Sequence, residues 1–355
     1  MGDMVKGNIA IAEAAVRAGI EVYAGYPITP STEVMEYLSG RMPELGRTFI
    51  QSESELAAIN MILGVSATGR RSLTASSGPG ISLKQEGISY LQQLGLPAVI
   101  LNVVRWGNGL GSLDASQTDY LRETRGGGNG DYRNIVLAPS TVQEGVDLMY
   151  EAFDLAEKYR TVVVVMTDSS LGQMMEPCDY PEFREITKCS WGLDGQYRVK
   201  RGNFLGRDIQ RESDEYIKKL HEIRENEQRW VSSCNEDAEY VFVAAGMPGR
   251  VMEGLVREMR NDGIKVGLIR PVTVWPYPDK AFDELRKVNP DVRGFISVET
   301  NGEGQMIEDV ALCAKKNGFG NVPCYAITQA CGVPEDDRIK KEFTMIADGR
   351  KKEVF

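Results

Sequence analysis

The sequence predicts an α/β protein that consists of two doubly wound domains. Over residues 1–167, short apolar runs alternate with helical patterns, which is typical of a parallel sheet covered by helices on both faces. This alternation breaks after residue 168 and returns at residue 239. With 355 residues and a hydrophobic content of 42%, the chain can bury more than one core. We therefore expect a first domain over 1–175, a connecting segment over 176–236 and a second, smaller domain over 237–355.

The elements of the first domain follow from apolar patterns and from the residues that interrupt them. Small residues predict a helix over 8–18, which Gly19 ends. The run 97–104 is almost continuously apolar, which indicates a strand covered on both faces. The other strands of this domain are expected at 20–26, 48–51, 72–75, 135–138 and 161–167. The other helices are expected at 32–38, 54–67, 81–93 and 142–158.

The connecting segment contains a stretch, 208–230, that is dense in charges of both signs. Tyr216, Leu220, Ile223 and Trp230 give it a thin apolar stripe at helical spacing. We expect a surface helix with a solvated face, and docking of a partner is the alternative role. In the second domain we expect strands at 240–245, 264–269, 294–298 and 322–327, a turn at 246–249, and helices at 250–261, 279–288 and 304–316.

Composition excludes several classes of function. The net charge of −10 argues against a nucleic-acid partner or an anionic membrane surface. No apolar run approaches the roughly 20 residues of a membrane span, and the first residues lack the apolar core of a signal peptide, so we expect a cytoplasmic protein. The only histidine, His221, lies in a charged run, which argues against a Ser-His-Asp triad or a multi-histidine metal site. The six cysteines form no C-x-x-C pair, so we expect buried thiols and no metal centre.

The turn Gly25-Tyr26-Pro27-Ile28-Thr29-Pro30-Ser31 is the first candidate site. It connects an expected strand to an expected helix, and Thr29 is predicted to cap that helix with Pro30 at its first position. A helix N-terminus carries free N–H groups and partial positive charge, which suits a small carboxylate. Glu55 follows on the next strand-to-helix turn. If the two turns are neighbours in a parallel sheet, an anion site and a carboxylate face the same crevice.

Glu55 has two possible roles on local pattern alone. Ser52-Glu53-Ser54-Glu55 has the spacing of a capping box, with Ser52 as N-cap and Glu55 at the third helical position. Capping therefore competes with catalysis as the role of Glu55. Composition does not distinguish Glu53 from Glu55 as the catalytic candidate.

Three further features follow later strands. The turn Ser76-Ser77-Gly78-Pro79-Gly80 would let a ligand approach the backbone closely. Arg105 ends an apolar strand, where its guanidinium could bind a carboxylate through two hydrogen bonds, although a surface arginine is the commoner case. The glycine-rich loop 107–132 is long enough for a functional lid. The patterns of phosphate-binding loops are missing, which argues against a plain nucleotide-binding α/β protein.

Several segments together resemble the alpha subunit of 2-oxoacid:ferredoxin oxidoreductases, enzymes that use thiamine diphosphate. They include Tyr26-Pro27-Ile28-Thr29-Pro30-Ser31 and Thr74-Ala75-Ser76-Ser77-Gly78-Pro79-Gly80. The others are 51–58, 137–144, 270–278, 298–301 and 304–306. The resemblance covers almost the whole chain. It implies a pyrimidine-binding domain of the thiamine-diphosphate type, followed by a domain similar to the C-terminal domain of transketolase.

The resemblance also implies roles for single residues. Glu55, nine residues before Gly64, matches the family glutamate that hydrogen-bonds the aminopyrimidine ring nitrogen and favours its imino tautomer. Tyr26 and Pro27 would lie beside the cofactor. Thr29 and Arg105 would hold the carboxylate of the substrate.

Within the family, 117–120 and 126–132 look most like the branched-chain, or 2-oxoisovalerate, type. That type implies oxidative decarboxylation of a branched-chain 2-oxoacid to acyl-CoA and CO2, with coenzyme A as co-substrate and electrons passed to ferredoxin. The alternatives are the same chemistry on 2-oxoglutarate or another 2-oxoacid, and a non-catalytic scaffold subunit.

The resemblance further implies that other chains complete the enzyme. The G-D-G and N-x-x pattern for magnesium and diphosphate is missing, and Gly130-Asp131-Tyr132 is an imperfect substitute. A beta subunit would therefore carry the diphosphate and Mg2+ half of the thiamine diphosphate site. Because the cysteines are not clustered, iron–sulfur clusters would belong to partners, which include a gamma subunit, a ferredoxin-like delta subunit and external ferredoxin.

Overall fold

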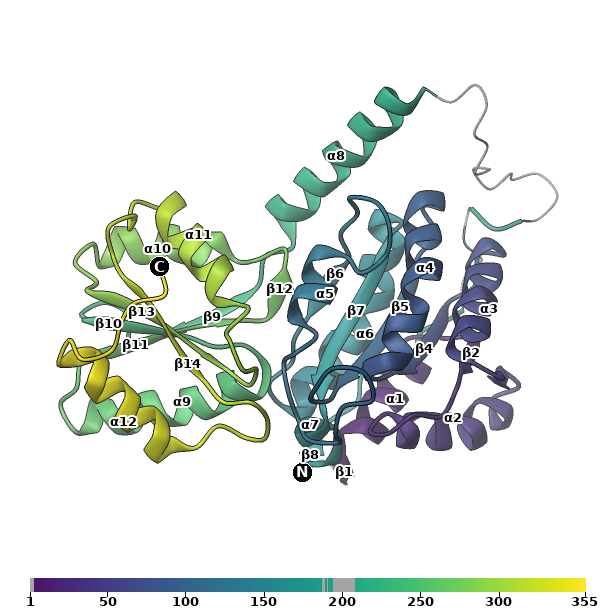
Figure 1. The fold of residues 1–355 in the computed structure, drawn as a ribbon. Helices are drawn as coiled ribbons and strands as arrows, with labels where there is room; N and C mark the ends of the chain where they lie inside the picture. Colours follow the sequence, from purple (N-terminus) through teal and green to yellow (C-terminus); the bar gives the residue numbers. More distant parts are fainter. Residues whose placement is uncertain (1–2, 187–188, 190, 194–207) are drawn as a thin grey trace.

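The computed structural model describes residues 3–186, 189, 191–193 and 208–355. It contains two main sheets side by side, each covered by helices (Figure 1). The larger sheet has the strand order β12-β6-β7-β5-β4-β2-β3. Its strands are β2 (Val22–Gly25), β3 (Thr48–Gln51), β4 (Ser72–Ser76), β5 (Ala98–Val104), β6 (Ile135–Leu137), β7 (Val162–Asp168) and β12 (Thr273–Trp275). Its helices are α1 (Gly7–Arg17), α2 (Thr32–Glu44), α3 (Glu55–Ala67), α4 (Gly78–Leu94), α5 (Tyr120–Arg125), α6 (Val142–Tyr159) and α7 (Ser169–Gln173).

The strands β2 to β7 pair in parallel, so the doubly wound sheet predicted from the alternation is confirmed. Every residue of β5 and of β7 is buried, which agrees with coverage of both faces. The edge strand β12 runs antiparallel to β6. It was not predicted, because it comes from the second half of the chain and only three residues form it.

The smaller sheet has the strand order β14-β13-β10-β11-β9, and only β9 is antiparallel to its neighbour. Its strands are β9 (Trp230–Ser233), β10 (Tyr240–Val243), β11 (Val266–Pro271), β13 (Gly294–Glu299) and β14 (Cys324–Thr328). Its helices are α9 (Gly246–Asn261), α10 (Asp279–Val288), α11 (Ile307–Lys316) and α12 (Asp336–Ala347). The short strands β1 (Asp3–Lys6) and β8 (Met175–Cys178) form an antiparallel pair of their own.

The charged stretch of the connecting segment forms α8 (Ile209–Asn226), which projects from the body of the molecule (Figure 1). Asp208 caps it by accepting a hydrogen bond from the backbone N–H of Arg211 at 3.1 Å. Leu220 and Ile223 are buried at its base, so the predicted apolar stripe anchors the helix. Trp230 lies outside the helix, in β9. No helix in the described ranges is both long and apolar enough to cross a lipid bilayer.

Two helix starts in the smaller domain differ from the prediction. Residues 246–249 were expected as a turn, but they form the first turn of α9, where Pro248 needs no N–H partner. The helix expected from residue 304 begins at Ile307. The Glu299 carboxylate accepts hydrogen bonds from the backbone N–H groups of Gln305, Met306 and Ile307 at 2.7, 2.8 and 3.0 Å, which ties this stretch to the end of β13.

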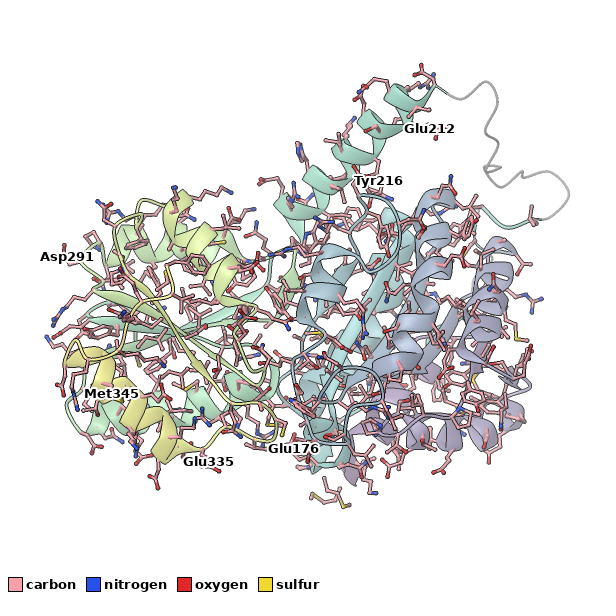
Figure 2. The ribbon with its side chains drawn as sticks, viewed as in Figure 1. Glu176, Glu212, Tyr216, Asp291, Glu335 and Met345 are labelled. Atoms are coloured by element: carbon pink, nitrogen blue, oxygen red, sulfur yellow. The ribbon has the colours of Figure 1, made fainter. Side chains whose placement is uncertain are left out.

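Side chains from the two halves of the chain meet between the sheets. Gln117 accepts a hydrogen bond from Thr300 N at 3.0 Å and donates to Ala245 O at 3.0 Å. Arg270 on β11 binds Glu144 on α6 through two hydrogen bonds of 2.9 and 3.1 Å. Glu176, which lies at this junction in Figure 2, is 2.5 Å from Arg250. These contacts hold the smaller sheet against the larger one.

Candidate functional site

Four sequence features meet at the carboxyl edge of the larger sheet. Strand β2 pairs in parallel with both β3 and β4, and β4 pairs in parallel with β5. The turns that follow β2, β3 and β4 therefore open on the same edge as Arg105, which follows β5. This is the edge at which open α/β sheets bind ligands. The condition stated from the sequence, that the turns leading to Ser31 and to Glu55 are neighbours in a parallel sheet, is therefore met.

The capping role predicted for Thr29 is wrong. Helix α2 begins at Thr32, and its N-cap is Ser31. Both the backbone N–H and the hydroxyl of Ser31 donate to Ile28 O, at 3.0 and 2.8 Å, so the chain closes a turn before the helix starts. Pro30 is consequently not the first helical residue, and Asn8 holds its carbonyl at 2.8 Å. The argument for an anion seat at a helix N-terminus does not apply to Thr29.

Tyr26, Pro27 and Thr29 all have exposed side chains at the open edge of the sheet. The backbone carbonyl of Thr29 accepts a hydrogen bond from Arg105 Nη1 at 2.6 Å. The structure thus brings Thr29 and Arg105 together.

Arg105 is buried, with 6% of its surface exposed, so it is not a surface arginine. Its Nη1 and Nη2 atoms donate to the carbonyls of Thr29 and Leu110, at 2.6 and 2.7 Å. Its Nε atom is buried and has no hydrogen-bond partner among the described residues. A Cβ atom on Gly78 would lie 3.1 Å from this Nε, and Gly78 also has a φ of +47°. Glycine at position 78 therefore leaves room for the guanidinium.

The structure does not form the capping box that was the alternative role of Glu55. The N-cap of α3 is Ser54, which accepts a hydrogen bond from Ala57 N at 3.2 Å, so Glu55 is the first helical residue and not the third. The Ser52 hydroxyl instead donates to the carbonyls of Gly25 and Ser54. Removing the capping role leaves the Glu55 carboxylate available for a ligand.

Burial distinguishes Glu55 from Glu53. Glu55 is 6% exposed, whereas Glu53 is exposed to solvent. The Glu55 Oε1 atom lies 2.6 Å from the position that a Cβ atom would take on Gly80. Any side chain at position 80 would displace the carboxylate, so the glycine turn after β4 and Glu55 form one site.

Several buried polar atoms at this edge have no hydrogen-bond partner within the described part of the chain. They are Ser76 Oγ, Ser77 Oγ, Asn102 Oδ1 and Arg105 Nε. Ser76 and Asn102 are opposite each other in the β4–β5 register. Because buried polar atoms in native proteins nearly always have a partner, four of them in one place indicate a binding site for a polar ligand.

Sequence reasoning missed the polar residues behind this edge. The Asn102 amide donates to Asp119 and Glu123, at 3.1 Å in each case, and Arg122 pairs with both carboxylates. Burial raises the pKa of Asp119 and of Glu123, and Arg122 opposes this rise. An asparagine inside the apolar run 98–104 was the available signal. The second missed residue is Lys84 on α4, which is fully buried.

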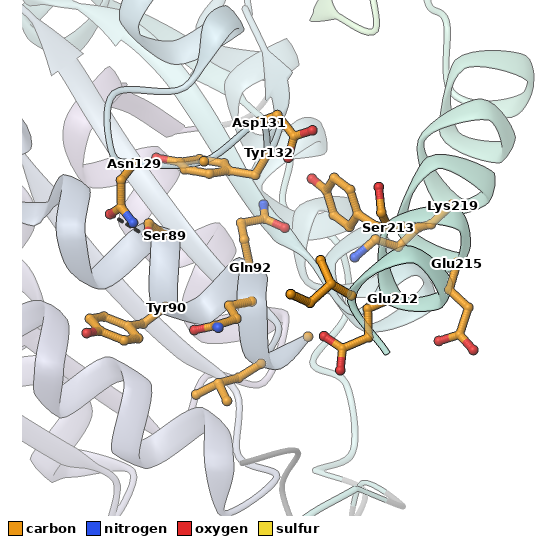
Figure 3. A pocket seen from close by; sticks show the side chains of 16 residues that line it. Ser89, Tyr90, Gln92, Asn129, Asp131, Tyr132, Glu212, Ser213, Glu215 and Lys219 are labelled. Carbon is orange, nitrogen blue, oxygen red and sulfur yellow. Dashed lines mark hydrogen bonds between the residues drawn. The ribbon is translucent and has the colours of Figure 1, made fainter. Parts of the chain in front are cut away.

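A groove of about 700 Å³ lies elsewhere, between α4, the loop 129–132 and α8 (Figure 3). Its lining begins at Ser89, so it belongs to the C-terminal half of α4, whereas Glu55 lies against the N-terminal turn. The groove is therefore separate from the candidate site. Across the parts of the chain that the structure describes, no group of three or more His, Cys, Asp or Glu side chains is placed to hold a metal ion.

Comparisons with known proteins found similar family models and similar chains. The family model described as pyruvate flavodoxin/ferredoxin oxidoreductase, thiamine diphosphate-binding, matches residues 13–241, and that of pyruvate:ferredoxin oxidoreductase core domain II matches 238–334. The ketoisovalerate oxidoreductase subunit VorB of Methanothermobacter thermautotrophicus is 48% identical over 318 residues, which cover 88% of this chain and 89% of the relative. The 2-oxoglutarate synthase subunit KorA of Methanocaldococcus jannaschii is 34% identical over 353 residues, with coverage of 89% and 95%.

Solved structures show the same fold. The 2-oxoglutarate:ferredoxin oxidoreductase from Magnetococcus marinus, with 2-oxoglutarate, coenzyme A and succinyl-CoA bound, superimposes with a TM-score of 0.82 at 23% identity. That match covers 97% of this chain, which spans 65% of the solved chain. A split-gene transketolase matches with a TM-score of 0.59 at 13% identity over 96% of this chain and 99% of that chain.

Proposed function

We propose a substrate, residue roles and partner surfaces for this chain, which belongs to the 2-oxoacid:ferredoxin oxidoreductase family. The resemblance stated from the sequence is thereby confirmed, and the thiamine diphosphate-binding family model spans most of the larger sheet. The proposed activity is oxidative decarboxylation of a branched-chain 2-oxoacid to acyl-CoA and CO2, with electrons passed to ferredoxin. The relative named for ketoisovalerate supports this choice at 48% identity, against 34% for the relative named for 2-oxoglutarate. We assign residues 1–175 to the pyrimidine-binding domain and 237–355 to the transketolase-like domain, with 176–236 connecting them.

The buried Glu55 carboxylate beside Gly80 is the observation that carries the proposal. Thiamine diphosphate, when bound, supplies an electron sink for decarboxylation. Glu55 would hold a proton at the pyrimidine ring nitrogen, and burial strengthens such a hydrogen bond. The unpartnered hydroxyls of Ser76 and Ser77 offer polar contacts at the same edge. The donor set therefore fits a flat ring with polar edges, and Tyr26 and Pro27 would lie beside it.

Arg105 and Thr29 are the proposed ligands of the substrate carboxylate. The Arg105 guanidinium is held by two neutral carbonyls, and one of them belongs to Leu110, which is 80% exposed. A carboxylate is the stronger acceptor for a guanidinium, so exchange of the Leu110 carbonyl for the substrate is favourable. The Thr29 hydroxyl, exposed on the neighbouring turn, would donate to the same carboxylate.

Exposed apolar side chains surround this edge and support a partner surface. They lie after β2, on the first turn of α3, on the second turn of α4, and in the loop after β5. They are Tyr26, Leu56, Leu83, Trp106, Leu110 and Leu113, each between 39% and 80% exposed. Such a gathering of apolar side chains is typical of a protein–protein interface. The proposed occupant is a beta subunit that carries the diphosphate and Mg2+ half of the site.

The names of the relatives as subunits support a complex of several chains. We propose that a gamma subunit and a ferredoxin-like delta subunit complete it and that the iron–sulfur clusters lie on partner chains. Coenzyme A would be the co-substrate, and external ferredoxin would accept the electrons.

The test is turnover of the reassembled complex on 2-oxoisovalerate, 2-oxoglutarate and pyruvate, with the purified single chain as control. We expect the highest kcat/KM on 2-oxoisovalerate and no turnover by the single chain. A preference for 2-oxoglutarate would replace the substrate but keep the chemistry. Steady turnover by the chain alone would contradict the shared site.

A further inference from the structure

Lys84 is a buried cation that the proposed function does not use. None of its surface is exposed, and its Nζ atom donates to Thr74 Oγ1 on β4 at 3.0 Å. This is its only hydrogen bond to the described residues, although an ammonium group has three donors. A buried charge is costly unless an opposite charge compensates it. The position of Lys84 therefore requires a nearby anion.

The face of α4 that carries Lys84 points toward α3. Gly80, Lys84 and Gly87 lie along one side of α4, because they are spaced by four and three residues. The Cβ position of Gly80 is 2.6 Å from Glu55 Oε1, and that of Gly87 is 2.6 Å from Ile59 Cγ2. Along α4, Lys84 thus lies between the level of Glu55 and the level of Ile59.

The side chains of strand β4 also place Lys84 and Glu55 at successive levels of the structure. Thr74 and Ser76 are two residues apart, so their side chains point to one face of the sheet. Ser76 Oγ contacts the Cβ position of Gly80, beside Glu55, while Thr74 holds Lys84. The ammonium of Lys84 consequently lies one layer deeper than the Glu55 carboxylate, on the same side of the sheet.

The Glu55 carboxyl group is the acidic neighbour of Lys84 on this side of the sheet. Burial lowers the pKa of Lys84 to about 8, and the attraction of Glu55 opposes this shift. The two side chains interact through space, since no hydrogen bond joins them. Strand β4 contributes only the neutral Thr74 and Ser76 to this face.

Other charges near α4 have partners of their own. Arg122 donates to Gly78 O and Ser82 Oγ at the first turn of α4, and it is paired with Asp119 and Glu123. Strand β5 contributes the neutral Asn102 to this network.

Arg105 lies beyond Gly78, where two carbonyls hold it. Lys84 is therefore the cation placed to act on Glu55 from within the protein.

We propose that Lys84 is a positioning residue whose buried ammonium, one layer below the Glu55 carboxylate, adjusts the proton affinity of the site that holds the pyrimidine ring of the cofactor. This inference rests on the proposed role of Glu55. A neighbouring cation favours the ionised form of a carboxylate. When the ring binds, one proton from solvent is taken up and held between Glu55 and the ring nitrogen. Lys84 thereby determines the pH range in which cofactor binding takes up a proton.

The experiment measures this proton uptake in the reassembled complex. Calorimetric titration with thiamine diphosphate and Mg2+, in two buffers of different ionisation enthalpy, gives the number of protons taken up per cofactor at each pH. We expect Lys84→Met to move the pH range of uptake upward by about one unit or more, because the loss of a cation raises the proton affinity of the site. Gln92→Met is the matched control, since Gln92 is also a buried polar residue of α4 but lies about two turns away from Lys84. It should keep the wild-type range.

A second variant allows the same test if the Lys84→Met chain does not assemble into the complex. Thr74→Val combined with Lys84→Met removes both partners of the hydrogen bond and leaves an apolar contact, which costs little stability. The same upward shift is expected. An unchanged pH range in either assembled variant would overturn the inference about Lys84.

Glu55→Gln separates this inference from the proposed function. It should abolish proton uptake in the wild-type range. If Glu55→Gln keeps the wild-type uptake, the proposed role of Glu55 fails, whatever Lys84 does. If only Lys84→Met behaves as wild type, the proposed function stands and Lys84 has no part in it.

Discussion

At the scale of single residues, the site depends on glycines, which carry no side chain, as much as on its charged residues. Gly78 leaves space for the Arg105 guanidinium, and Gly80 leaves space for the Glu55 carboxylate. Both charged groups are buried, and both belong to the edge where polar atoms lack partners. Burial without full pairing is costly, and it is most often retained where a ligand completes the site.

Replacement of Glu55 tests the role of the buried carboxylate. In the reassembled complex, Glu55→Gln should lower kcat for decarboxylation by about 10²–10⁴, since an amide can neither give nor take the proton at the ring nitrogen. Glu53→Gln is the matched control, because Glu53 is a solvent-exposed neighbour on the same turn, and its activity should stay near that of the wild type. Equal rates for Glu55→Gln and the wild type would remove Glu55 from the mechanism.

Asp168 provides a pH-dependent test of stability. It ends β7 and accepts a hydrogen bond from Leu171 N at 2.9 Å, and burial raises its pKa from 3.8 to about 6. Because the folded-state pKa is the higher one, this group favours folding fully below pH 3.8, and the benefit is lost as the pH rises through about 6. Asp168→Asn keeps the acceptor but not the charge. It should be more stable than the wild type at pH 8, by at most about 3 kcal/mol.

The measurement for Asp168 is urea unfolding of the full chain between pH 5 and pH 8. The stability difference between Asp168→Asn and the wild type should shrink as the pH falls. A difference that is constant over this range would show that the carboxylate does not titrate as described.

At the scale of elements, the sequence predicted those that have a strong pattern of their own. Strand β3 and helix α10 have the predicted bounds, and the buried strands β5 and β7 were evident from their apolar runs. The strand β12 was missed because tertiary pairing creates it. The helix α12 was missed although Ile339, Phe343 and Ile346 give it an apolar face at helical spacing.

The residues of the candidate site show the same difference between local patterns and tertiary contacts. Local motifs identified Glu55, Thr29 and Arg105 as candidates, because each follows a strand on a turn of distinctive composition. Lys84 and Asn102 were missed, because their proximity to these residues depends on the α3–α4 packing and on the β4–β5 register. Neither relation is visible in one sequence. The capping roles failed for a related reason, since in both helices the observed N-cap lies two residues after the expected one.

Two glycines test the close packing of α3 against α4. A Cβ atom at Gly87 would lie 2.6 Å from Ile59 Cγ2, so Gly87→Ala should separate the helices and lower the free energy of unfolding by about 1–3 kcal/mol. Gly64 on α3 has no atom within 4 Å of its Cβ position. Gly64→Ala should therefore raise the free energy of unfolding by about 0.5–1 kcal/mol, through helix propensity alone. Urea unfolding of the full chain compares the two, and effects of equal sign would contradict the packing.

At the scale of the whole molecule, the two sheets are joined by buried polar contacts as well as by apolar ones. Gln117 reaches Thr300 and Ala245, and Arg270 reaches Glu144. Gln117 lies in a segment that resembles the branched-chain type of the family, yet its side chain joins the sheets. The segment that resembles the branched-chain type therefore contains at least one residue with a structural role. For this reason substrate preference has to be measured directly.

Arg270 is the most informative residue of this junction. Its side chain is 7% exposed and binds Glu144 twice, and it also binds Glu253 at 2.6 Å. Arg270→Met would leave two carboxylates without their cation, so the free energy of unfolding should fall by about 3–5 kcal/mol. Because Glu144 belongs to the helix α6 of the larger sheet, this loss should also let the two sheets unfold in separate steps.

Arg293→Met is the control, because the side chains of Arg293 and Glu239 are 60% and 48% exposed and their ion pair should contribute little to stability. The double variant Arg270→Met with Glu144→Gln removes one unpaired charge, so it should be more stable than the sum of the two single changes. Thermal unfolding followed by calorimetry and by tryptophan fluorescence measures both effects. If Arg270→Met unfolds in one step with the stability of Arg293→Met, the ion pairs do not hold the sheets together, and the apolar contacts alone must account for the junction.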